Sequence, residues 1–167
     1  MRYRDVPPAR DFDGLCRIYE RVPESSDTVE DCCAHLVSET DIGTRAEASQ
    51  WLVFLRALDL VETDEEGYYR VDDTLDRTTL ADRFEERVLG ASAIVSVVEE
   101  SSTPLTSTEI ANAIEESAPR SLRTDSDWRA EWEQYVGRLL EWAAVFGRLD
   151  RSDESDDTWV SGGQSGN

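Results

Sequence analysis

Apolar side chains recur every three or four residues in three segments of the first half of the chain. This spacing places them on one face of a helix, so each segment is predicted to form an amphipathic helix. Thr44 and Glu47 form a capping box at the start of the third helix. The predicted helices lie between Asp11 and Pro23, between Thr28 and Gly43, and between Thr44 and Leu58.

A β-hairpin is predicted directly after the third helix. Two short runs rich in β-branched and aromatic residues, Leu60–Thr63 and Tyr68–Val71, flank a polar turn that ends at Gly67. The polar residues 72–74 come next, and they mark the predicted domain boundary.

The same order of elements is predicted for the second half. Apolar periodicity indicates one long helix, then a short helix that begins with the capping box of Thr106 and Glu109, then a third helix. These helices run from about Thr79 to Glu100, from Thr106 to Pro119 and from about Ser126 to Phe146. The runs 148–151 and 158–160 predict a second hairpin.

This order, three helices and a hairpin found twice, resembles that of tandem winged helix-turn-helix proteins. Thr44–Val71, which ends in LRALDLVETDEEGYYRV, is similar to the third helix and wing of transcription-regulator domains, and Leu105–Ile114, LTSTEIANAI, is similar to their short second helix. The resemblance implies a mainly α fold with small β-hairpins, built as two tandem winged-helix domains. The expected divisions are an N-terminal arm at 1–10, domains at 11–74 and 75–160, and a disordered tail at 161–167.

The charge of the chain is strongly acidic and evenly spread. Its 167 residues include 37 acidic and 17 basic ones, every basic residue is an arginine, and the formal net charge is −20. In its acidity and its lack of lysine, the chain resembles the proteins of halophiles that accumulate salt, those of the haloarchaea in particular. At ~1 M salt the Debye length is ~3 Å, so repulsion among the acids is largely screened, and charge opposes DNA binding less than in dilute buffer.

Signatures of membrane insertion, export, catalysis and metal binding are missing. No apolar run approaches the ~18 residues that a membrane helix needs, and the N-terminus lacks an apolar secretory stretch, so a cytoplasmic protein is expected. No P-loop, Gly-rich dinucleotide turn or nucleophile elbow occurs. Cys16, Cys32, Cys33 and His35 lack the spacing of a zinc site. We therefore expect no enzyme activity, no metal and no cofactor.

DNA reading is predicted for the first domain. A helix-turn-helix places the start of its last helix in the major groove, where arginine pairs with guanine and glutamine with adenine. In the first repeat that position holds the candidate DNA-binding residues Thr44, Arg45, Ser49 and Gln50. In the second repeat it holds acids that would face phosphates, and these are Asp125, Asp127, Glu131 and Glu133 around Arg129.

Two functions follow. The leading one is a non-enzymatic DNA-binding transcription regulator that holds double-stranded DNA through the first domain. The alternative is a protein–protein interaction adaptor, with a protein partner or a homodimer through the second domain. A basic recognition face favours the regulator, and an exposed apolar patch of several hundred Å² favours the adaptor. In the last helix, the stripe of Trp128, Trp132 and Tyr135 could stack bases, but its spacing favours packing in the core. Trp142 lies off the stripe and is a candidate for a domain junction or a dimer contact.

Overall fold

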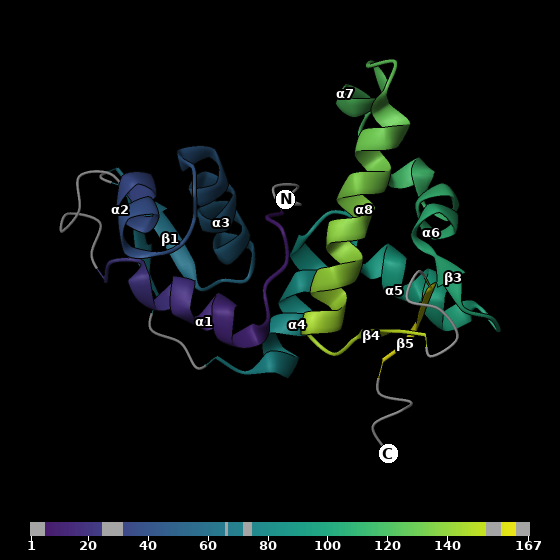
Figure 1. The fold of residues 1–167 in the computed structure, drawn as a ribbon, viewed down its shortest axis with the longest axis horizontal. Coiled ribbons are helices and arrows are strands. Elements are labelled where there is room, and N and C mark those ends of the chain that lie inside the picture. The colour runs from purple at the N-terminus through teal and green to yellow at the C-terminus, as the bar shows by residue number, and fades with distance from the viewer. Residues whose placement is uncertain (1–5, 25–31, 66, 72–74, 153–157, 163–167) are drawn as a thin grey trace.

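The computed structural model describes residues 6–24, 32–65, 67–71, 75–152 and 158–162. The fold is mainly helical with two small antiparallel sheets, as the sequence predicts. Figure 1 shows two groups of helices side by side, and each group carries one of the sheets.

The first winged-helix unit consists of three helices and an antiparallel hairpin. Its elements are α1 (Phe12–Arg21), α2 (Cys32–Glu39), α3 (Arg45–Ala57), β1 (Val61–Asp64) and β2 (Gly67–Arg70). Thr44 caps α3 as predicted, because its side-chain oxygen accepts a hydrogen bond from the backbone N–H of Glu47 (3.1 Å). The backbone N–H of Arg70 donates to the carbonyl oxygen of Pro23 (2.6 Å), which joins the segment after α1 to the hairpin.

The second winged-helix unit contains a third strand. Its elements are α5 (Ala91–Glu100), β3 (Leu105–Thr106), α6 (Ser107–Ala113), α8 (Trp128–Val145), β4 (Leu149–Arg151) and β5 (Thr158–Ser161). The strands lie in the order β3-β5-β4, and β5 pairs antiparallel with both neighbours. The predicted capping box is confirmed, since Thr106 and Glu109 exchange both hydrogen bonds at the start of α6 (3.0 and 3.1 Å).

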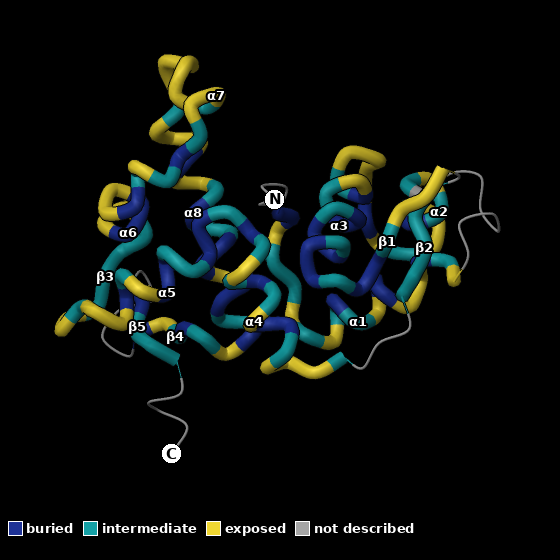
Figure 2. The backbone as a smooth tube through the Cα atoms, turned by 180° about the vertical axis from the view of Figure 1, so that it is seen from behind, coloured by how far each residue is buried: buried dark blue, intermediate teal, exposed yellow. Residues whose placement is uncertain are grey.

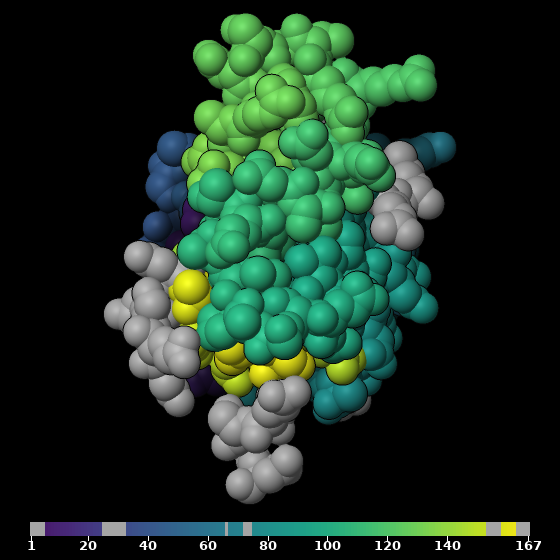
Figure 3. All heavy atoms as spheres, turned by 90° about the vertical axis from the view of Figure 1, so that its right-hand side faces the viewer, coloured from purple at the N-terminus to yellow at the C-terminus, as the bar shows by residue number. Residues whose placement is uncertain are grey.

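Two short helical turns separate α6 from α8, namely the 3₁₀-helix η2 (Glu115–Ser117) and the helix α7 (Arg120–Arg123). Helix α7 contacts α8, and together they project beyond the rest of the second unit (Figure 3, green, at the top). This projection gives α8 a length of 18 residues, five more than the 13 of α3.

The prediction of one long helix from Thr79 to Glu100 is wrong. Two helices lie there, α4 (Arg77–Arg87) and α5, and they are separated by Val88 in extended conformation and by Gly90 in left-handed conformation (φ 83°). The apolar spacing continues across the break because Val88 is fully buried. The second half therefore has more than the predicted three helices, and α4 is an additional one between the two winged-helix units.

The two units share one hydrophobic core, and an aromatic cluster forms the junction between them. Trp142 of α8 packs against Phe54 (ring centroids 4.6 Å apart) and Trp51 (5.5 Å) of α3, and Phe84 and Phe146 extend the cluster. The indole N–H of Trp142 donates to the carbonyl oxygen of Pro7 (2.9 Å). The prediction of a domain junction at Trp142 is confirmed.

The prediction that the aromatic stripe of α8 lies in the core is confirmed for Trp132 and holds only in part for Trp128 and Tyr135. Trp132 is buried, while Trp128 and Tyr135 are half-buried and pack against the core. Several predictions lie outside the described residues: the start of the second helix at Thr28, the boundary at 72–74, the turn of the second hairpin and most of the tail. The polar turn of the first hairpin exposes Asp64 and Glu65.

Candidate nucleic-acid interface

The start of α3 is the most exposed part of the first helix-turn-helix. Thr44, Arg45 and Ser49 are exposed there, and Figure 2 shows this end of α3 on the same side of the molecule as the projecting end of α8. Ile42, just before the helix, is buried and fixes the entry of the chain into α3. The helix N-terminus adds a partial positive charge at this position, which favours a phosphate.

One face of α3 turns outward and the other is in the core. Arg45, Ser49, Val53 and Arg56 follow one another at helical spacing, the first two exposed and the last two half-buried. The opposite face, with Trp51, is fully buried. The outward face carries two arginines and no carboxylate, so it is locally basic on a chain of net charge −20.

An ion pair neutralises the carboxylate that precedes this face. Arg10 donates to Asp41 (2.6 Å), and this hydrogen bond, together with the positive charge of Arg10, holds the pKa of Asp41 below its usual value. The pairing lowers the repulsion that Asp41 would exert on a phosphate near Thr44.

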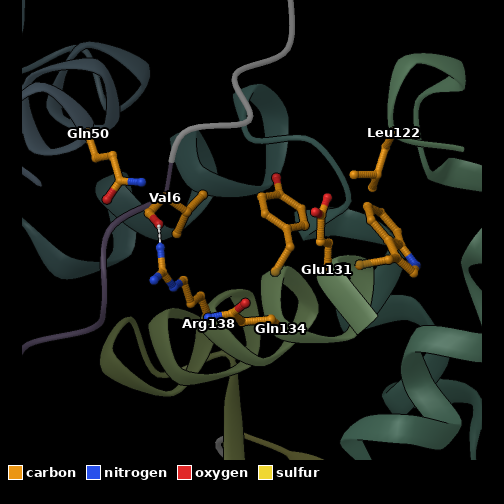
Figure 4. A pocket seen from close by; sticks show the side chains of 8 residues that line it. Val6, Gln50, Leu122, Glu131, Gln134 and Arg138 are labelled. Carbon is orange, nitrogen blue, oxygen red and sulfur yellow. Dashed lines mark hydrogen bonds between the residues drawn. The ribbon is translucent and has the colours of Figure 1, made fainter. Parts of the chain in front are cut away.

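Gln50 lies apart from the other three candidate residues. It is half-buried and lines a cleft of about 260 Å³ between α3 and α8 (Figure 4). The other polar side chains of this cleft come from α8, and they are Glu131, Gln134 and Arg138. Sequence reasoning missed these cleft residues, because nothing in local spacing shows that residues about 85 positions apart meet.

The start of α8 is acidic, in contrast to α3. Asp125, Asp127, Glu131 and Glu133 are exposed there, as the sequence indicates. Glu133 accepts a hydrogen bond from the hydroxyl of Thr108 in α6 (2.7 Å). Arg129 lies 3.8 Å from Glu115 and above the ring of Trp128. Its charge is thus directed toward its own domain.

The described residues contain no cluster of histidine, cysteine and carboxylate side chains suited to a metal ion. Cys16 and Cys33 are half-buried, and burial raises the pKa of Cys16, helped by the nearby carboxylates of Asp13 and Glu20. Among the described helices, none combines the length and the hydropathy that crossing a membrane requires.

Comparison with known families supports the architecture. The family model described as the halobacterial double winged helix domain matches residues 1–161. Neither the curated proteins nor the solved structures contain a match. The structure has two winged-helix units on one core, and the family match covers almost the whole chain. The chain therefore belongs to the halobacterial double winged helix domain family.

Proposed function

We propose that this protein is a non-enzymatic, cytoplasmic transcription regulator that binds double-stranded DNA through its first domain. The observation that supports this most is the outward face of α3, where Thr44, Arg45 and Ser49 are exposed at the start of the second helix of a helix-turn-helix. Arg45 reads guanine, and the hydroxyls of Thr44 and Ser49 donate to phosphate.

The surface favours this regulator over an adaptor with an apolar docking face. Among the described residues, the exposed apolar side chains are alanines and Pro8, and no larger one is in the exposed class. An adaptor surface of several hundred Å² requires larger apolar groups. The second domain keeps a role in binding a protein partner or a second copy, since its acidic helix start repels phosphate.

The acidic surface sets the conditions under which DNA is bound. At ~2 M KCl the Debye length is below ~3 Å, so the acids of the first hairpin turn repel DNA only weakly. Direct hydrogen bonds to base edges then supply a larger share of the affinity than long-range attraction does.

The test is DNA binding by an Arg45→Ala variant. Loss of one bidentate base contact costs ~1–3 kcal/mol, so specific affinity should fall roughly tenfold to a hundredfold while the fold stays intact. Fragments of genomic DNA are selected by the purified protein at ~2 M KCl, sequenced, and the preferred sites are titrated with each variant. Circular dichroism checks that Arg45→Ala folds.

Arg129→Ala is the matched control, because Arg129 is exposed in the first turn of α8, as Arg45 is in the first turn of α3. It should leave the preferred sites and their affinity unchanged. If the unmutated protein selects no DNA and instead purifies with one partner protein, the regulator is wrong and the adaptor is supported.

A further inference from the structure

The cleft between α3 and α8 has an aromatic floor that is held in place. The rings of Trp132 and Tyr135 are stacked, with centroids 5.5 Å apart and an interplanar angle of 24°. The indole N–H of Trp132 donates to the carbonyl oxygen of Ala111 (3.1 Å), and the hydroxyl of Tyr135 donates to that of Leu89 (2.6 Å). Both rings are therefore fixed before any ligand arrives, which lowers the entropic cost of binding.

The rim of the cleft offers several hydrogen-bonding groups. Gln50 reaches it from α3, and Glu131 and Gln134 reach it from α8 (Figure 4). None of these three side chains has a hydrogen-bond or ion-pair partner within the part of the chain that the structure describes. Arg138 uses one N–H on the carbonyl oxygen of Val6 (2.9 Å) and keeps further N–H donors.

Size and charge narrow the class of ligand. A volume of about 260 Å³ suits a molecule of one or two rings. The charges of Glu131 and Arg138 cancel within the cleft, so its lining favours an uncharged ligand over an anion or a cation. The side-chain amide of Gln50 and that of Gln134 each present a donor beside an acceptor. Such a pair matches a planar ring whose edge alternates donors and acceptors.

We propose that this interdomain cleft binds an uncharged nitrogen heterocycle of the nucleobase class, which stacks on Tyr135 and hydrogen-bonds to Gln50 and Gln134. The ligand contacts both winged-helix units at once and therefore stabilises their present arrangement. Such a ring is either a free base or an unpaired base of a nucleic acid, and the same chemistry recognises both.

A second consequence rests on the proposed function. Gln50 lies one residue beyond Ser49 on α3, so a ligand held by its amide fixes the same helical turn that carries the DNA-contacting Ser49. Binding of the heterocycle and binding of DNA should then change each other's affinity by the same factor.

The experiment is calorimetric titration at ~2 M KCl with free adenine, guanine, cytosine and uracil as probes, and with a DNA hairpin that carries one unpaired adenine. Gln134→Ala and Gln50→Ala should each lower the affinity of the binding probe by roughly twofold to tenfold. Tyr135→Ala should abolish it, and Tyr135→Phe, which keeps the ring, should retain it. Binding of a free base assigns the site to a small effector. Binding of the hairpin alone, if it is lost in Tyr135→Ala, assigns the site to a nucleic-acid base.

The variants separate this inference from the DNA-binding proposal. Ser49→Ala should weaken DNA binding and leave heterocycle binding unchanged. Gln134→Ala should weaken heterocycle binding and leave DNA binding unchanged. The inference is overturned if no probe binds with a Kd below about 1 mM, or if the Gln134→Ala and Tyr135→Ala proteins bind as tightly as the unmutated one. If the unmutated protein binds the heterocycle but selects no DNA, only the proposed function is overturned.

Discussion

The same left-handed turn follows the long helix that precedes the hairpin in each unit, with Asp59 in the first unit and Gly147 in the second. Asp59 is the one described non-glycine residue with positive φ (64°), and it lets the N–H of Leu60 reach the carbonyl oxygen of Leu55 (3.0 Å). After α8, Gly147 (φ 80°) does the same for Arg148 and Ala143 (2.8 Å). Aspartate tolerates this left-handed conformation better than most residues, so the same turn forms without glycine.

We expect Asp59→Val to destabilise the protein by about 1–3 kcal/mol, because a β-branched residue is strained at this φ. Asp59→Gly should stay within about 1 kcal/mol of the unmutated protein, since it relieves strain, frees the unfolded chain and loses only the half-exposed ion pair with Arg87. Urea denaturation in high salt measures both. Equal stability of Asp59→Val and the unmutated protein would show that the turn carries no strain.

The candidate DNA residues show what a sequence reveals about single side chains. The cap at Thr44 and the exposure of Arg45 and Ser49 follow from local spacing, because the buried face of an amphipathic helix fixes the exposed one. The position of Gln50 does not follow, since it depends on how the second unit packs against α3. Tertiary contacts between distant segments leave no mark in helical periodicity.

At the scale of elements, helical spacing predicted the helices better than their breaks. The apolar pattern from Leu80 to Val98 is continuous, yet Gly90 turns the chain between α4 and α5. An added Cβ at Gly90 would lie 3.3 Å from Leu139, so glycine is needed there both for its φ and for the space. Strand β3 is only two residues long, too short for alternation to reveal it.

Helix α4 holds the two units together from both sides. Arg83 donates to the carbonyl oxygen of Leu58 (3.0 Å) in the first unit, while Asp82 and Glu85 pair with Arg148 in the second. Burial raises the pKa of Glu85 even though the guanidinium of Arg148 opposes the shift. Helix α4 therefore joins the two units both through the chain and through its side-chain contacts with each of them.

The N-cap residue of α4, Asp76, is expected to make the stability of the protein depend on pH. Asp76 accepts hydrogen bonds from the hydroxyl and the N–H of Thr79 (2.8 and 3.0 Å), and these hold the pKa of Asp76 below its usual value. A lowered folded-state pKa adds stability above the unfolded-state value, and this stability is lost as the pH falls through the folded-state value. Stability should therefore fall more steeply below about pH 4 than in Asp76→Asn, whose amide caps the helix without titrating.

Melting temperatures of the two proteins between about pH 2 and pH 6 test this expectation. The difference in melting temperature between the two proteins should be constant above the usual aspartate pKa range. Below that range, the melting temperature of the unmutated protein should fall more than that of Asp76→Asn. Parallel curves over the whole range would show that Asp76 has the same pKa in the folded and unfolded chains.

At the scale of the whole molecule, charge is carried by the surface and the core is apolar. Ser152 is the one polar side chain in the buried class among the described residues, so the described acids lie at least partly in solvent. Residues 1–74 hold 8 arginines and 18 acids, and residues 75–167 hold 9 and 19, which gives −10 for each part. Repulsion therefore acts within each winged-helix unit and also across the aromatic junction.

Screening of this repulsion predicts a salt-dependent stability of characteristic shape. Between ~0.1 M and ~1 M KCl the Debye length falls from ~10 Å to ~3 Å, so most of the repulsion disappears in that interval. The melting temperature should rise steeply up to ~1 M and more slowly up to ~2 M. Salting-out of apolar surface alone would instead give a gradual rise over the whole range. Scanning calorimetry at several KCl concentrations distinguishes the two. A flat or falling curve would show that the acids do not destabilise the fold and would remove the physical case for a halophilic protein.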